Sequence, residues 1–320
     1  MKKLKAGIIG CGQIAGGYNF ICERDKSLSH ACSYKNIKSV DLVAACDPNK
    51  KALHEFQQKW RVNSIYPSIS EMLENEKIDI LSVCSPTEFH LESFEAISHN
   101  KNIKGIFCEK PLAYDLNDAK KILSLAKEKI VSINYFRRWN PSLKKLKNDF
   151  QSKKYGTIDF VHIRYTKGLI NNASHYIDLL TWFFGAPIEI ETTYIYPKIS
   201  FDFGVDFRLT FKDGFVASFS HCPELKFVHI EMDFFTDMGK LSLLQRGQYI
   251  SWYKSEIDQS YSTFKKLSLS KSYETEWQDC PTRAIMELIS RIQGKGKISC
   301  TLEDGIQNSI ICKKIIDSPY

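Results

Sequence analysis

The stretch LKAGIIGCGQIA, residues 4–15, joins an apolar segment directly to a glycine-rich loop. The apolar residues predict a buried parallel strand, and the G-x-G-x-x-A pattern after it predicts a turn into a helix. Gly10 allows the tight turn, Gly12 leaves room for a pyrophosphate beside bare backbone, and Ala15 lets the helix lie close to the sheet. Phosphates would bind at the amino end of that helix, where free N–H groups and the helix dipole favour negative charge. Short glycine patterns also arise by chance in turns, so this stretch alone leaves dinucleotide binding open.

A carboxylate follows the next apolar segment. Residues 42–46 are apolar, and Asp47 directly after them can accept hydrogen bonds from both ribose hydroxyls. The interval from Gly10 to Asp47 is 37 residues, whereas about 20 are usual for this fingerprint. We therefore expect an insertion within residues 18–39, as an extra polar loop followed by the returning part of the first helix.

Asp47 has a second interpretation and a consequence for cofactor choice. Asp47-Pro48 also fits a helix N-cap followed by proline at the first helical position, and the two roles can coexist. A carboxylate at this point would repel a 2′-phosphate, which predicts NAD. NADP stays open because Lys50 and Lys51 follow.

Composition limits the class of protein. With 320 residues, 43% of them hydrophobic, the chain can bury a large core and form two domains. The ten cysteines form no CxxC pair and no zinc-like spacing, so we expect reduced thiols, no metal site and a cytoplasmic location. No apolar run is long enough to cross a membrane. The net charge of +7 is spread over short basic pairs among acids, which argues against nucleic acid binding.

The amino-terminal part alternates strand and helix patterns, which predicts a doubly wound α/β domain with a parallel sheet. Strands are expected at residues 4–10, 40–46, 62–66, 79–85, 105–109 and 130–135. Helices are expected at residues 12–18, 48–60, 69–75, 88–99 and 115–128, the last capped by Asp115. We place this domain at residues 1–134.

Residues 135–320 have a different pattern, which predicts an α+β domain with a large, mostly antiparallel sheet. The segments FDFGVDFRLTF, FVASFS and FVHIEMDFF are strand-like, with a hairpin turn at Asp213-Gly214. Helices are expected at 174–184, ending at Gly185, and at 281–293 and 302–316, the last opened by Thr301 with Asp304.

Several motifs, in this order, resemble the Gfo/Idh/MocA oxidoreductases, the family of glucose-fructose oxidoreductase and inositol dehydrogenase. They are GCGQIA, VCSPTEFH at 83–90, CEKPLA at 108–113, NYFRRWNP at 134–141 and ASHYIDLLTWFFG at 173–185. The resemblance covers nearly the whole chain, and the EKP element is its most specific part. It implies cofactor binding by Gly10, Gly12, Gln13, Ile14, Asp47, Ser85, Pro86, His90, Glu109 and Lys110. For His90, a capping or structural role is an equal alternative.

The chemistry implied is hydride transfer at a carbinol carbon, which also needs an acid or base for the hydroxyl proton. Lys110 follows the strand at 105–109, at the carboxyl edge of the sheet where ligands bind in such folds. An ammonium there could polarise a carbonyl or stabilise an alkoxide. The resemblance gives Lys110 this catalytic role, with Pro111 fixing the turn through a cis bond. The alternative is a solvated surface lysine.

The resemblance makes His175 the second catalytic candidate, as a proton carrier or substrate ligand. Asp178 lies on the same helix face and could orient the imidazole or contact the substrate, although both residues also fit a polar helix start. Many family members carry aspartate where this chain has Asn171, and an amide cannot take the proton. Tyr135 and Arg138 are further substrate-binding candidates, while Arg138 with Trp139 equally fits a stack between domains.

Together these features predict an NAD(P)-dependent oxidoreductase acting on a secondary alcohol or ketone of a sugar, cyclitol or nucleotide-linked sugar. An exposed sheet face rich in Phe and Tyr would suit a homodimer or homotetramer, unless those residues face an inner core. Two alternatives remain. One is a related enzyme that uses NAD transiently in glycoside cleavage, and the other is an inactive NAD(P)-binding regulator.

Overall fold

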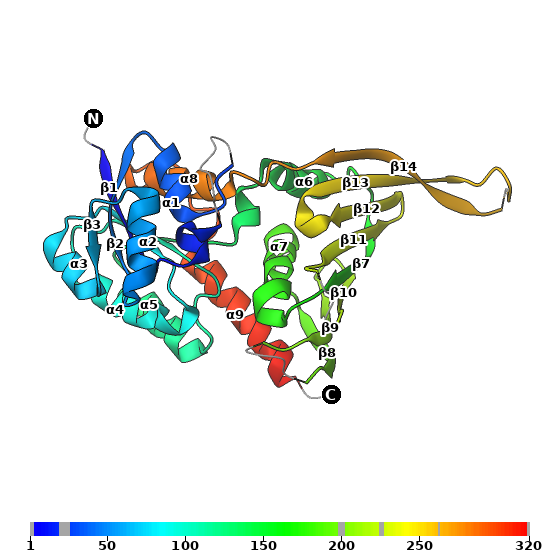
Figure 1. Ribbon diagram of the computed structural model, residues 1–320. Helices are drawn as coiled ribbons and strands as arrows, with labels where there is room; N and C mark the ends of the chain where they lie inside the picture. The colour runs from blue at the N-terminus through cyan, green and yellow to red at the C-terminus, as the bar shows by residue number, and fades with distance from the viewer. Residues whose placement is uncertain (1–2, 19–25, 198–201, 224–226, 262, 319–320) are drawn as a thin grey trace. The chain divides into compact units, whose positions relative to one another are not determined.

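The computed structural model describes residues 3–18, 26–197, 202–223, 227–261 and 263–318, and the chain divides into two compact units (Figure 1). The first unit holds residues 1–139 and 278–309, and the second holds residues 140–277 and 310–320. The boundary expected between residues 134 and 135 is close to the first division, but it omits the return of residues 278–309 to the first unit. A local pattern shows where the element type changes and says nothing about which sheet a later helix covers.

The first unit is built on a six-stranded parallel sheet in the order β3-β2-β1-β4-β5-β6. This order confirms the predicted doubly wound fold. The chain order runs outward from β1 on one side and outward from β4 on the other, so the topological switch point lies between β1 and β4. The strands are β1 (Leu4–Ile9), β2 (Val40–Cys46), β3 (Ser64–Tyr66), β4 (Ile80–Val83), β5 (Gly105–Cys108) and β6 (Ile130–Ile133). Every residue of β4 and β5 is buried, as expected for a sheet covered on both faces.

Helices and single turns complete the first unit. They are η1 (Gln13–Gly17), α1 (His30–Asn36), α2 (Lys50–Trp60), α3 (Ile69–Asn75), η2 (Thr87–Phe89), α4 (His90–Ser98), α5 (Leu116–Leu125), η3 (Phe136–Trp139) and α8 (Cys280–Ile292). α8 packs against β5, β6 and α1. It lies so close to β5 that a Cβ on Gly105 would be 2.7 Å from Cδ1 of Ile292. The predicted cap of α5 is confirmed, because Asp115 accepts a hydrogen bond from the Asn117 amide at 2.6 Å.

The second unit contains an eight-stranded sheet in the order β14-β13-β12-β11-β7-β10-β9-β8. Only the β7–β10 pair among these neighbours is parallel, so the predicted mostly antiparallel sheet is confirmed. The strands are β7 (Ile158–Tyr165), β8 (Glu189–Ile195), β9 (Val205–Thr210), β10 (Val216–His221), β11 (Ile230–Thr236), β12 (Gly239–Leu244), β13 (Tyr249–Ile257) and β14 (Lys265–Glu274). The expected hairpin turn joins β9 to β10, with Gly214 at φ +91°. Phe201, at the start of the predicted strand segment, lies outside the described residues.

The helical elements of the second unit are α6 (Pro141–Gln151), η4 (Leu169–Ala173), α7 (Ser174–Phe184) and η5 (Gln245–Gly247), and α9 (Leu302–Asp317) contributes its last part. α7 has the predicted bounds. α6 was not predicted, although Asn140 caps it and Pro141 occupies its first turn. The capping box of α9 is confirmed, since the Asp304 amide donates to Thr301 Oγ1 and the Thr301 amide donates to Asp304 Oδ2.

The aromatic residues of this sheet are divided between an inner core and an outer face. Phe207, Phe219 and Phe234 are at most 1% exposed and share one apolar core with α7. Phe160 and Phe235 are 38% and 37% exposed. The exposed-face expectation and the inner-core alternative thus each apply to part of these residues.

Cysteine chemistry departs from expectation at one residue. Eight of the described cysteines are free thiols, as predicted, whereas Cys32 in α1 is disulfide-bonded. Within the described part of the chain, no helix has both the length and the apolar character that a bilayer crossing requires.

Candidate functional site

The loop after β1 requires glycine at its first position. Gly10 has φ +84°, a left-handed conformation that L side chains rarely adopt. A Cβ there would lie 2.7 Å from the backbone nitrogen of Ser85, which follows β4. The backbone that follows β1 therefore packs directly against the backbone that follows β4. In this fold class, ligands bind at that switch point of the sheet.

Gly12 gives the same loop an open face. Its φ is −77°, and a Cβ placed on it would meet no atom of the described residues within 4 Å. This open backbone satisfies the steric requirement for a closely approaching pyrophosphate. Gln13 is exposed and Ile14 half-buried in the π-helical turn η1, which replaces the helix expected over residues 12–18. A five-residue turn is too short to provide the helix dipole expected at this site. A bound anion would therefore be held by the N–H groups of the loop.

The close packing predicted for Ala15 involves the next residue as well. Ala15 is fully buried, but Gly16 has the tightest surroundings. A Cβ on Gly16 would lie 2.1 Å from Nε1 of Trp60 and 2.8 Å from Cε2 of Phe56, both in α2. Gly12 is thus open, whereas Gly16 is enclosed.

Asp47 connects the end of β2 to the glycine-rich loop. Its Oδ2 accepts a 2.7 Å hydrogen bond from the Cys11 amide, and its Oδ1 accepts a 2.8 Å bond from the Asn49 amide. The N-cap of α2 is Asn49, whose side chain accepts from the first helical amides. The N-cap interpretation of Asp47 is therefore wrong. Asp47 remains half-exposed beside the loop.

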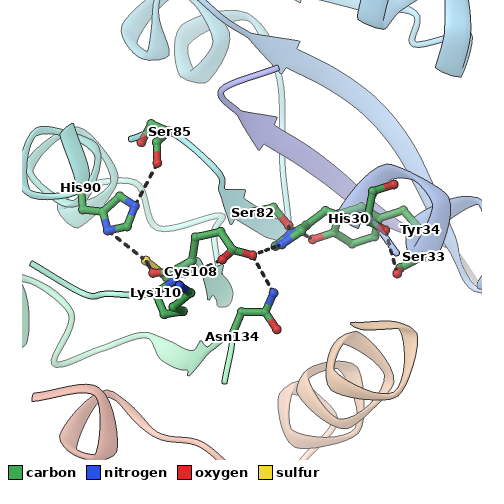
Figure 2. Close-up of polar contacts among 11 residues, drawn as sticks. His30, Ser33, Tyr34, Ser82, Ser85, His90, Cys108, Lys110 and Asn134 are labelled. Carbon is green, nitrogen blue, oxygen red and sulfur yellow. Dashed lines mark hydrogen bonds and ion pairs between the residues drawn. The ribbon is translucent and has the colours of Figure 1, made fainter. Parts of the chain in front are cut away.

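His90 connects two loops at the carboxyl edge of the sheet. Its Nε2 lies 3.1 Å from the carbonyl oxygen of Ser85 (Figure 2), and its Nδ1 lies 3.0 Å from the carbonyl oxygen of Leu112. The ring is fully buried, and burial lowers its pKa despite these carbonyl partners. This geometry favours the structural alternative for His90. Ser85 and Pro86 form the loop that the ring holds.

Lys110 is the second residue after β5 and is half-buried. The Lys110-Pro111 peptide bond is cis, as the family resemblance implied. The preceding residue, Glu109, accepts a hydrogen bond from the Lys110 amide through Oε2 at 3.3 Å. β5 adjoins β4 in the sheet, so Lys110 and Ser85 both follow parallel strands at the same edge.

A buried polar network surrounds Glu109, and Figure 2 labels its members His30, Tyr34, Ser82 and Asn134. Its Oε1 accepts from Asn134 Nδ2 at 2.6 Å and lies 2.9 Å from His30 Nε2. His30 Nδ1 lies 2.9 Å from Ser82 Oγ, which is 2.8 Å from the Tyr34 hydroxyl. Sequence reasoning missed these four partners. Asn134, beside Tyr135 in a family-like motif, carried the clearest available signal.

The Arg138 side chain is 3% exposed, and its Nη1 lies 3.0 Å from Asp304 Oδ2 and 2.9 Å from the Ser299 carbonyl oxygen. Neighbouring Trp139 donates from Nε1 to Glu287 Oε1 at 2.9 Å. These contacts hold Arg138 within the first unit, and its substrate contact stays a prediction. Tyr135 is 1% exposed, also in the interior.

In the second unit, α7 places His175 and Asp178 three residues apart. His175 is partly exposed and Asp178 is 2% exposed. Asn171, in the turn η4 before α7, is exposed. Its backbone amide donates a 2.7 Å hydrogen bond to Oδ2 of Asp202. The other carboxylate oxygen, Oδ1, accepts from the Ile170 amide at 3.1 Å. Asp202 was not singled out from the sequence, because it is distant in the chain from the turn it caps.

Family comparison agrees with the loop geometry and the strand order. Residues 4–135 match the Gfo/Idh/MocA model, described as an oxidoreductase family with an NAD-binding Rossmann fold. The matched segment spans all six strands of the parallel sheet. The described residues contain no group of three or more His, Cys, Asp or Glu side chains arranged to hold a metal ion.

Similar proteins extend the comparison along the chain. The myo-inositol 2-dehydrogenase of Thermotoga maritima is 30% identical over 162 residues, which are 50% of this chain and 43% of that protein. The chain thus aligns with less than half of that relative. The structure of myo-inositol 2-dehydrogenase from Lactobacillus plantarum has a TM-score of 0.75 at 20% identity and covers 99% of this chain and 97% of its own. The WlbA dehydrogenase of Bordetella pertussis, in complex with NADH and UDP-GlcNAcA, has a TM-score of 0.76 at 17% identity and covers 98% and 95%. These structural likenesses establish a shared fold for both units.

Proposed function

We propose that the protein is an NAD(P)-dependent dehydrogenase or reductase acting on a secondary alcohol or ketone of a sugar, cyclitol or nucleotide-linked sugar. The observation that carries this proposal is the placement of Lys110 after β5, on the sheet edge that holds the open Gly12 loop. The family of residues 4–135 and the names of the similar dehydrogenases support it.

The residues present fit a dinucleotide. Gly10 and Gly12 would form the phosphate loop with Gln13 and Ile14, and Asp47 would accept from the ribose. Ser85 and Pro86 would line the nicotinamide side, with Glu109 and Lys110 after the next strand. When bound, the nicotinamide exchanges a hydride with the carbinol carbon.

The proton of the substrate hydroxyl needs a separate carrier. Lys110 as an ammonium would stabilise developing alkoxide charge, and as an amine it would accept the proton. We assign His175 as the second proton carrier, with Asp178 and Asn171 as substrate-binding residues. Asn171 supplies an amide that can hydrogen bond a sugar hydroxyl without taking its proton.

We infer that NAD is preferred over NADP. The Asp47 carboxylate lies beside the loop, where it would repel a 2′-phosphate. An Asp47→Asn variant keeps the shape but loses the charge, so the ratio of NADPH to NADH affinity should rise about tenfold, or about 1.4 kcal/mol. Fluorescence titration with both cofactors measures this ratio, and an unchanged ratio would contradict the inference.

We also propose a homodimer or homotetramer that uses the outer sheet face around Phe160 and Phe235. These rings are 6.4 Å apart and are more than a third exposed. Light scattering of the native chain and of a Phe160→Ser, Phe235→Ser double variant tests this. An oligomer that persists unchanged in the variant would place the interface elsewhere.

Two lysines at opposite ends of β5 provide the test of the main proposal. Lys110 follows this strand, whereas Lys104 precedes it and forms an exposed ion pair with Asp79 at 3.2 Å. Lys110→Ala should lower kcat by about 100-fold or more while NADH still binds. Lys104→Ala should leave kcat within about twofold, because exposed ion pairs contribute little. Equal turnover in the two variants would overturn the role of Lys110.

A further inference from the structure

His30 begins α1 and reaches the carboxyl edge of the sheet from the interior. Its ring is fully buried and stacks on Phe107 of β5, with ring centroids 4.6 Å apart. Its two nitrogens each lie 2.9 Å from an oxygen, Nδ1 from Ser82 Oγ and Nε2 from Glu109 Oε1 (Figure 2). The ring is therefore fixed by one stacking contact and two polar contacts.

The direction of the bond to Glu109 follows from its ionised carboxylate, which can only accept. Burial raises the pKa of the Tyr34 hydroxyl, which keeps its proton and can donate it to Ser82 Oγ, 2.8 Å away. Ser82 can then donate its own hydrogen to Nδ1 of His30. The ring hydrogen lies on Nε2 and is donated to Glu109. A protonated ring would turn Nδ1 into a second donor toward Ser82 Oγ and displace the Ser82 hydrogen from this chain.

Glu109 is held by three donors. Its Oε1 accepts from His30 and, at 2.6 Å, from Asn134, and its Oε2 accepts from the Lys110 amide at 3.3 Å. Burial by itself raises the pKa of this carboxyl, but the hydrogen bond and charge of His30, the hydrogen bond from Asn134 and the charge of Lys110 outweigh it, so the pKa is lowered. The carboxylate is thus ionised, and its hydrogen bonds are charge-assisted.

We propose that His30 is a positioning residue for Lys110, acting through the carboxylate of Glu109. Glu109 and Lys110 are consecutive, so the orientation of this carboxylate sets the peptide that carries the lysine side chain. A misplacement of about 1 Å at a reacting group can cost about 100-fold in rate. The inference rests on the catalytic role proposed above for Lys110.

Turnover of three variants tests the positioning role. His30→Ala removes the donor to Glu109 and should lower kcat about 10- to 100-fold, with NADH affinity within about threefold. His30→Gln restores an N–H donor of similar reach and should recover about tenfold of that loss. The matched control is Ser33→Ala, which removes a buried hydroxyl of the same helix that bonds only to the Ser29 carbonyl. It should leave kcat within about twofold.

A second readout does not depend on activity. Side-chain 15N spectra of His30 in the chain without substrate or cofactor should show a ring hydrogen on Nε2. Glu109→Gln, which keeps the shape and loses the charge, should shift this signal and lower kcat as His30→Ala does. If His30→Ala does not fold, the kcat of Glu109→Gln serves as the kinetic test instead.

The outcomes separate the two proposals. Loss of turnover in Lys110→Ala, with normal turnover in His30→Ala and Glu109→Gln, would overturn the positioning role alone. A His30 hydrogen on Nδ1 would overturn it as well. Retained turnover in Lys110→Ala would overturn the proposed function and, with it, this inference.

Discussion

Gly12 and Gly16 lie four residues apart, yet their surroundings oppose each other. Gly12 faces open space with an ordinary φ, whereas Gly16 is enclosed by Trp60 and Phe56. Gly12→Ala should keep the free energy of unfolding within about 0.5 kcal/mol. It should weaken NADH binding about tenfold or more by obstructing the phosphate loop. Gly16→Ala should lower the free energy of unfolding by about 1–3 kcal/mol through overpacking.

Urea denaturation and NADH fluorescence titration measure the two effects separately. If Gly12→Ala bound NADH as tightly as the native chain, the pyrophosphate would not lie against this loop. If Gly16→Ala were as stable as the native chain, the helix and loop would repack more freely than the contacts with Trp60 indicate.

His90 gives a pH dependence to stability. Burial lowers its folded-state pKa below the ordinary value of 6.5. The unfolded chain therefore takes up a proton first as the pH falls, and stability is lost below about pH 6.5 down to the folded-state pKa. Burial also lowers the pKa of His162 and the pKa of His221. Both residues therefore add to the loss of stability as the pH falls.

Thermal unfolding between pH 8 and pH 5 checks this. His90→Gln should lower the Tm at pH 8, because the contacts to Ser85 and Leu112 weaken, and should flatten the decline toward pH 5. A variant that declined as steeply as the native chain would show that His90 does not contribute to the acid sensitivity.

At the scale of elements, Asp202 determines how the chain enters α7. Its carboxylate accepts backbone hydrogen bonds from Ile170, Asn171 and Phe203. Asp202→Ala leaves these amides without that acceptor and should loosen the turn before His175. We expect the substrate KM to rise about tenfold, with NADH affinity unchanged.

Asp258 offers a matched control in the same unit. It holds an exposed turn by accepting from the Ser260 amide at 2.8 Å. Asp258→Ala should leave both the substrate KM and NADH affinity unchanged. Equal KM values in the two variants would show that the order of η4 is not needed for substrate binding.

Most elements could be predicted because their ends carry local signals. Asp115 and the Thr301–Asp304 pair cap helices where the sequence indicated. The helix expected over residues 12–18 is present as a π-helical turn over Gln13–Gly17, where α2 encloses Gly16. α6 was missed although Asn140-Pro141 is an ordinary start signal.

At the scale of the whole molecule, contacts between distant parts of the sequence could not be predicted. His30 meets Ser82 and Glu109 across separations of 52 and 79 residues. Arg138 meets Asp304 after the chain has passed through the second unit. Motifs identified Lys110 and the loop because those features are continuous in sequence. The partners that orient them come together only in the folded chain.

The central claim is that Lys110 acts in a nicotinamide-dependent oxidation or reduction. The most direct measurement is absorbance at the reduced-nicotinamide band, with native chain and Lys110→Ala, across sugars, inositols and nucleotide sugars in both directions. We predict steady turnover of the native chain on at least one substrate, abolished in Lys110→Ala while cofactor binding persists. Tight cofactor binding by the native chain without net redox on any substrate would contradict the claim and favour a transient-NAD enzyme or a regulator.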